Sequence, residues 1–107
     1  MTILDATFSA LADPTRRAIL ARLATGETTV GELTKPFAIS PPAISRHLKV
    51  LEGASLIINE RRGKHRFCRL DPRGFRGAGE WLEFYRELWT ERLDRLEHHF
   101  SARRKST

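Results

Sequence analysis

Three side chains that carry hydrogen-bond donors gather on one face of a short helix predicted to begin after Ser40. Ser45, Arg46 and Lys49 supply a hydroxyl, a guanidinium and an ammonium group there. In the major groove of DNA, arginine can pair with guanine and serine can meet either base type. We therefore expect this face to contact DNA through Ser40, Pro42, Ser45, Arg46 and Lys49. From this helix alone, an ordinary amphipathic surface helix is the alternative interpretation.

The ends and the buried side of this helix are marked in the sequence. The Ser40 hydroxyl can accept from the free amides of the first turn, and Pro41 suits the first helical position because its missing N–H costs nothing there. Gly53 can adopt the left-handed conformation that closes the other end. The apolar residues at i, i+4 and i+7 predict a buried face made of Ile44, Leu48 and Leu51.

A basic hairpin is predicted directly after this helix. Residues 56–62 and 65–70 are expected to form two strands, because Gly63 can supply the positive φ that a tight turn requires. Residues 61–76 hold seven basic residues and one acid. This charge favours a wing, which is a hairpin that touches DNA phosphates beside the helix that reads the bases. That reading helix is here the one predicted to begin after Ser40. The wing residues are expected to be Arg61, Arg62, Lys64 and Arg66. The alternative is a solvated hairpin whose edge charges discourage aggregation.

Helical patterns before Ser40 complete a helix-turn-helix. Asp13 can cap the start of a helix, and Gly26 can close its end. The three arginines of this helix, at positions 16, 17 and 22, are expected to face largely outward. Thr29-x-x-Glu32 has the form of a capping box. The expected helices cover residues 3–11, 14–25 and 29–36. A short helix, a turn of three or four residues and a second capped helix make a helix-turn-helix.

A long aromatic helix is predicted after a loose lead-in at residues 74–79, and it should reach about Phe100. Its apolar residues step by three and four like the seam of a coiled coil, and Trp81, Phe84 and Leu88 widen the seam into a second face. The core of a small domain can cover one such face, and we expect the other to be a dimer contact. The expected interface residues are Phe8, Leu82, Tyr85, Trp89, Leu93 and Leu96. The alternative is that all of them pack within one chain.

Composition sets the limits of the interpretation. The chain has 107 residues and a net charge of +6, so we expect one basic domain over residues 1–100 and a basic, frayed tail over 101–107. A single cysteine excludes an internal disulfide and fits a reducing compartment. The first 14 residues hold two acids and no basic segment, unlike a secretory signal, and no apolar run approaches the roughly 20 residues of a membrane span. We expect a cytoplasmic protein without membrane contact.

Isolated reactive side chains do not indicate catalysis. The chain has no Gly-rich phosphate loop, no nucleophile with a base at a known spacing and no HExxH motif, so we expect no enzyme activity. Cys68 lies in a predicted strand, where a small inert thiol is the usual case and a redox sensor is the alternative. His47 flanks the buried stripe of its helix, and we expect it to pack rather than to read bases.

The order of these elements resembles the ArsR/SmtB family of winged-helix repressors. The likeness covers nearly the whole chain and rests on four segments: Phe8-x-Ala10-Leu11-Ala12-Asp13-Pro14-Thr15-Arg16-Arg17-x-Ile19-Leu20, Val30-x-Glu32-Leu33, Ile39-Ser40-x-x-Ala43-Ile44-Ser45-Arg46-His47-Leu48-Lys49-Val50-Leu51, and Leu56-Ile57 followed by Arg61-Arg62-Gly63-Lys64. The resemblance implies a homodimer that binds double-stranded DNA and whose terminal helices pair. It also implies a repressor that is released by an effector, which the sequence does not disclose.

Two departures from the family bear on metal binding. Thr29 and Gly31 stand where metal-sensing members carry a Cys-x-Cys, so that soft-metal site is absent. On the last helix, the adjacent His98 and His99 project about 100° apart and are poorly set to share one ion within a chain. A site completed across a dimer by Glu91 or Asp94 is the alternative. We expect no metal and no cofactor, and the likeness is nearest to the SdpR-like members without metal ligands.

The sequence therefore predicts a mainly α fold with a small β-hairpin, a dimeric winged helix-turn-helix. The predicted function is a sequence-specific transcriptional regulator, a homodimeric repressor on an inverted-repeat operator. The alternative is a winged-helix module that binds protein and lacks specific DNA binding. That module would expose aliphatic or aromatic residues on the helix after Ser40, whereas Ser45, Arg46 and Lys49 are polar donors.

Overall fold

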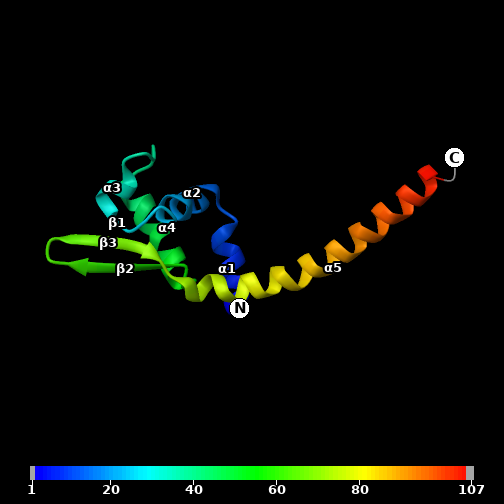
Figure 1. The fold of residues 1–107 in the computed structure, drawn as a ribbon. Helices are drawn as coiled ribbons and strands as arrows, with labels where there is room; N and C mark the ends of the chain where they lie inside the picture. Colours follow the sequence, from blue (N-terminus) through cyan, green and yellow to red (C-terminus); the bar gives the residue numbers. More distant parts are fainter. Residues whose placement is uncertain (1, 106–107) are drawn as a thin grey trace.

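The computed structural model describes residues 2–105 and shows a helical domain with a small sheet and one long protruding helix (Figure 1). The elements in chain order are α1 (Ile3–Leu11), α2 (Pro14–Leu23), β1 (Thr28–Thr29), α3 (Val30–Thr34), α4 (Pro41–Gly53), β2 (Ile57–Arg62), β3 (His65–Leu70) and α5 (Pro72–Lys105). The predicted mainly α fold with a hairpin is confirmed.

The core lies among α1 to α4 and the base of the sheet. In α2 to α4, Val30 was expected to be buried and is half-buried. The other apolar residues expected to face inward there are all less than a tenth exposed: Ile19, Leu20, Leu23, Leu33, Ile44, Leu48 and Leu51. Each such side chain contributes roughly 1.5–3 kcal/mol when it leaves water. The helices that carry the helix-turn-helix are therefore held by one shared core.

The sheet has three strands, because the two-residue strand β1 pairs with β3. Its order is β1-β3-β2 and both pairings are antiparallel. The hairpin turns at Gly63, whose φ of 61° is the positive value that the turn was expected to need. β1 was not predicted from the sequence because two residues are too few to show a period of two.

The expected role of Gly53 at the end of α4 is wrong. Gly53 is the last helical residue, and the left-handed conformation belongs to Ser55, with a φ of 56°. The start of α5 holds Ser55 in this conformation, because the Gly74 amide donates to the Ser55 carbonyl oxygen at 2.8 Å. A side chain on Gly74 would overlap the carbonyl oxygens of Ala54 and Ser55, so this close approach requires glycine.

The expected loose lead-in at residues 74–79 is also wrong, because α5 begins at Pro72. The buried Asp71 carboxylate accepts from the Arg73 amide at 3.0 Å and from the Arg73 guanidinium at 2.7 Å. The same contacts hold the pKa of Asp71 below its ordinary value. A cap and a proline at the first helical position thus start the helix before its glycines.

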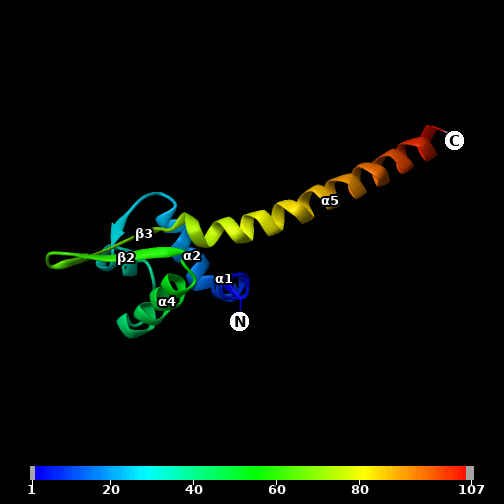
Figure 2. The same ribbon diagram turned by 90° about the horizontal axis from the view of Figure 1, so that it is seen from below.

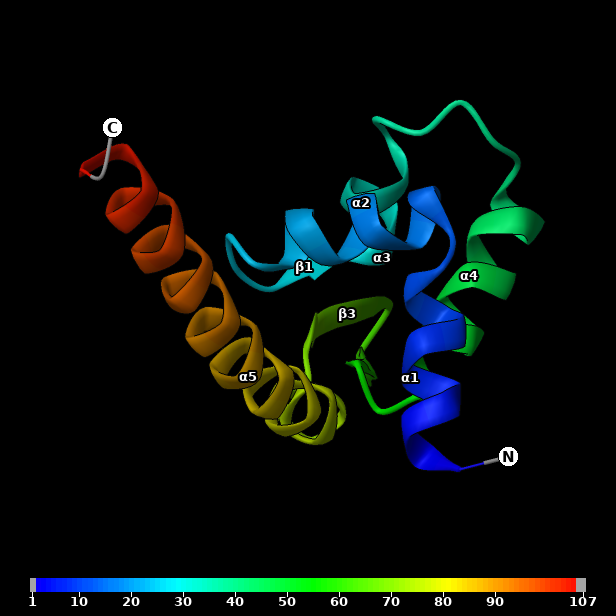
Figure 3. The ribbon, with the colours of Figure 1, turned by 90° about the vertical axis from the view of Figure 1, so that its right-hand side faces the viewer.

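From Glu80 to Ser101 every residue of α5 is exposed, and the helix leaves the domain as a free arm (Figure 2). The molecule consequently extends 71 Å along its longest axis and 29 × 22 Å across. The expectation that one apolar face of this helix packs on its own core is wrong for most of its length. Trp81 meets Phe8 of α1, and beyond Trp81 the arm stands clear of α1 to α4 in Figure 3. The helix also continues beyond Phe100 through the first five residues of the expected tail, and residues 106–107 lie outside the described residues.

None of the helices in the described part of the chain is both long and apolar enough to cross a membrane.

Candidate nucleic-acid interface

The reading helix α4 has the expected cap at its N-terminal end. The Ser40 hydroxyl accepts from the Ala43 amide at 3.4 Å and Pro41 occupies the first helical position. With its apolar side in the core, α4 exposes the side chains expected to meet DNA: Ser40, Pro42, Ser45, Arg46 and Lys49. The helix therefore presents two cations and two hydroxyls on a rigid element, which suits readout in a groove.

The helix that precedes α4 is short and firmly anchored. The Thr29 hydroxyl accepts from the Glu32 amide at 3.1 Å, and Leu33 is fully buried. α3 ends at Thr34, two residues before the expected end at Pro36, so the connection to α4 spans six residues, 35–40, instead of three or four. Half-buried Phe37 packs against the core from this connection.

His47 is half-buried and packs against the start of α2, as predicted. Its Nδ1 lies 3.3 Å from Nη1 of Arg16 and 3.9 Å from a carboxylate oxygen of Asp13. Arg16 was expected to face outward, but its guanidinium donates to the Ala10 carbonyl at 2.7 Å and to the Ser9 carbonyl at 3.1 Å. Arg16 therefore joins the C-terminal end of α1 to the reading helix, and its guanidinium donates to carbonyls of the last turn of α1.

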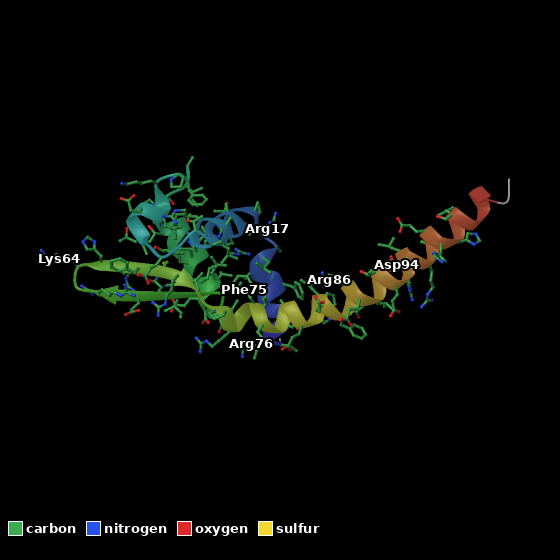
Figure 4. All side chains as sticks on the ribbon, viewed as in Figure 1. Arg17, Lys64, Phe75, Arg76, Arg86 and Asp94 are labelled. Carbon is green, nitrogen blue, oxygen red and sulfur yellow. The ribbon has the colours of Figure 1, made fainter. Side chains whose placement is uncertain are left out.

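The hairpin of β2 and β3 projects from the domain on the side opposite the free end of α5, with Lys64 at its tip (Figure 4). The basic residues Arg61, Lys64 and Arg66 are exposed, and the ion pairs found within residues 2–101 do not involve them. α4 packs against β2. The helix and the hairpin thus carry exposed cations for which residues 2–101 supply no carboxylate partner.

Arg62 differs from the other expected wing residues because carboxylates surround it. Its two terminal nitrogens donate to the two carboxylate oxygens of Glu27 at 2.7 and 3.0 Å. Its Nε donates to Glu60 at 3.4 Å, and its guanidinium lies 4.8 Å from the centre of the Phe67 ring. These hydrogen bonds raise the pKa of Arg62 and lower that of Glu27. The Glu27 contact, across 35 residues of sequence, was not foreseen.

The residues expected at a dimer contact form an exposed stripe on α5. Leu82, Trp89, Leu93 and Leu96 are each at least half exposed, and Tyr85 is 38% exposed. Phe8 on α1 is half-buried and meets Trp81 edge-on at 5.3 Å between ring centres, so α1 and α5 share one aromatic surface. A continuous apolar surface of this extent marks an interaction site.

The described residues contain no group of three or more His, Cys, Asp or Glu side chains placed to hold a metal ion. Asp94, Glu97 and His98 do line an open groove of about 630 Å³ on the outer part of α5. They lie on one exposed helix.

Cys68 should be unreactive in the folded protein. It is fully buried, and burial, together with the Glu52 carboxylate, raises its pKa to about 11. At pH 8 about one thiol in a thousand is then ionised, and the thiolate is the reactive form. A disulfide reagent should therefore label the protein promptly only in denaturant. Rapid labelling of the folded protein at pH 8 would support the redox-sensor alternative instead.

A helix-turn-helix whose second helix exposes donors beside a basic hairpin defines a winged helix-turn-helix DNA-binding protein. Comparison with known proteins agrees, since the family described as "Helix-turn-helix domain" matches residues 11–60. The HTH-type transcriptional regulator Rv2034 of Mycobacterium tuberculosis is 44% identical over 89 residues, which cover 83% of this chain and 80% of that protein. The transcriptional repressor SdpR of Bacillus subtilis is 37% identical over 75 residues, 70% of this chain and 83% of that one.

The fold leads to the same family. The crystal structure of an ArsR family transcriptional regulator superposes with a TM-score of 0.77 at 40% identity, covering 83% of this chain and 98% of that chain. The chain belongs to the ArsR/SmtB family of winged-helix transcriptional regulators, as the sequence motifs predicted. It is a DNA-binding transcriptional regulator, and its relatives belong to a class whose members are not enzymes.

Proposed function

We propose that this protein is a cytoplasmic, homodimeric repressor that binds an inverted-repeat operator. The observation that carries the proposal is the reading helix itself, which buries Ile44, Leu48 and Leu51 and exposes Arg46 and Lys49. A helix of this kind can enter the major groove, where Arg46 can donate two parallel hydrogen bonds to one guanine. The exposed wing cations beside it can meet the adjacent phosphates.

The surface of α5 supports the proposed homodimer. Beyond the contact between Phe8 and Trp81, the exposed residues of this helix as far as Ser101 have no support from their own domain. In proteins most helical stability comes from the packing of an amphipathic face. A second copy would cover the apolar stripe from Leu82 to Phe100 and would stabilise the arm at the same time. Regulators of this family typically bind DNA as dimers.

Two-fold symmetry of the protein sets the form of its DNA site. The two reading helices of a dimer enter successive major grooves, so half-sites should lie about 34–36 Å apart, centre to centre, in an inverted repeat. A repressor role is proposed because SdpR, one of the relatives, is named a transcriptional repressor. No metal or effector is assigned.

Selection of bound duplexes from a random DNA pool tests the proposal directly. We expect an inverted repeat with half-sites about 10–10.5 base pairs apart, centre to centre. Affinity for the selected duplex should exceed that for a scrambled duplex by roughly 10³-fold or more at physiological salt. Recovery of no enriched sequence would contradict specific binding and would favour the protein-interaction module.

A further inference from the structure

The two faces of the hairpin carry basic residues in different surroundings. Neighbouring strand residues point to opposite faces, so Arg61 and Arg62 lie on different sides of the sheet. Arg61 comes four residues after Ile57 in β2, so both side chains point to the same face of the sheet. Ile57 is buried in the core on the face that packs against α4. By register, Arg61 and its partner Arg66 thus continue the sheet face that packs on the reading helix. Arg62 lies on the other face.

On the face away from α4, every cation is matched by a carboxylate. Arg62 bridges Glu27 and Glu60, and Arg69 donates to Glu60 at 2.7 Å and lies 3.5 Å from Glu27. The two arginines and two glutamates therefore form an ion-pair network with no net charge. Within it, the bidentate pair of Arg62 and Glu27 joins β2 to the α2–β1 connection. Networks with bidentate geometry hold a surface more firmly than isolated pairs do.

The opposite face shows the reverse arrangement. Arg61 and Arg66 are direct cross-strand partners, and within the described residues no carboxylate pairs with either of them. Like charges placed directly opposite each other destabilise a strand pair. An anion between the two guanidinium groups would remove that repulsion, and a DNA phosphate is the anion that the proposed function supplies at this place.

We propose that Arg62 is a positioning residue that makes no DNA contact. Through Glu27 it braces the hairpin against the α2–β1 connection, so that Arg61 and Arg66 on the other face meet a backbone phosphate. This inference rests on the proposed function and divides the wing cations that the sequence grouped together. Arg62 acts through its carboxylate partners, whereas Arg61, Lys64 and Arg66 act on DNA.

A charge exchange separates the two roles. Arg62→Glu alone should weaken operator binding about tenfold, because it places a third carboxylate in the network. Combining it with Glu27→Arg restores two cations and two anions, and affinity should return to within about threefold of the wild type. If Arg62 contacted phosphate, the double variant would stay as weak as Arg62→Glu, because a carboxylate would then face the phosphate. That result would overturn the proposal.

The structural role of the contact between Arg62 and Glu27 can be tested without DNA. Arg62→Ala should raise hydrogen-exchange rates of the hairpin amides in the free protein, because this variant removes the link to Glu27. Arg61→Ala, the matched control at the neighbouring position, should leave those rates unchanged or lower them by relieving the repulsion with Arg66. Equal exchange in the wild type and Arg62→Ala would refute the brace. Absence of DNA binding by the wild type would instead refute the proposed function and leave this measurement valid.

Discussion

Replacing Trp89 and Leu93 by glutamate should convert a dimer of roughly 25 kDa into a monomer of 12.3 kDa. Both side chains are 57% exposed in the single chain, so their removal costs the isolated domain little. In a dimer they would be buried, and two carboxylates from each protomer would enter an apolar contact without partners. Analytical ultracentrifugation at micromolar concentration measures the change.

Thr90→Glu is the control, because it adds one carboxylate between these positions, about 100° around the helix from Trp89. This control should leave the dimer intact. The double variant should also show a weaker far-UV helical signal, since the arm beyond Trp81 would lack a packing partner. The affinity of the double variant for the full inverted repeat should fall about 100-fold or more, because the half-sites are then bound one at a time. An unchanged sedimentation coefficient would contradict the proposed interface.

Local signals in the sequence were sufficient for the reading helix. Ser40 and Pro41 mark its start, and three apolar residues at helical spacing define its buried side, so the exposed donors follow by exclusion. These features act within one or two turns of the chain. The hairpin was equally accessible, because Gly63 has the positive φ that its turn demands.

Features that depend on distant segments were missed or misplaced. Ser55, rather than Gly53, adopts the left-handed conformation because Gly74 of α5 packs on its carbonyl group. Arg62 was grouped with the other wing cations because Glu27, 35 residues earlier, cannot be recognised as its partner from sequence. The alternation of strand faces could have separated Arg61 from Arg62, but only the ion pair shows what that separation means.

The start of α5 illustrates competing local signals. Asp71 and Pro72 are a cap and a first helical residue, whereas the glycines at 74, 77 and 79 lower helix propensity. In the structure the cap prevails, and Gly74 serves the close approach to Ser55 within the helix. Composition alone could not reveal that one of three glycines has a packing role.

Truncating Arg46 to alanine should cost roughly 1–3 kcal/mol per half-site and should flatten the base preference at one position. Arg46 is exposed in the middle of α4, where its guanidinium can donate to O6 and N7 of one guanine. Binding to scrambled DNA should change much less, because base contacts supply specificity and phosphate contacts supply most of the non-specific affinity. Repeating the selection from random DNA with this variant identifies the position whose preference disappears.

Comparing Lys64→Ala with Arg46→Ala distinguishes phosphate contact by the wing from base readout by α4. Lys64 lies at the hairpin tip, where we expect it to meet a phosphate and no base edge. Its removal should therefore weaken binding to operator and scrambled duplex alike. The slope of log affinity against log salt should become shallower by about 0.9 for each phosphate that the variant no longer neutralises, or about 1.8 for a symmetric dimer. Arg46→Ala should leave that slope nearly unchanged while its affinity for the operator falls. If Arg46→Ala weakened both duplexes equally and Lys64→Ala altered base preference, the wing would be the reading element and α4 the anchor.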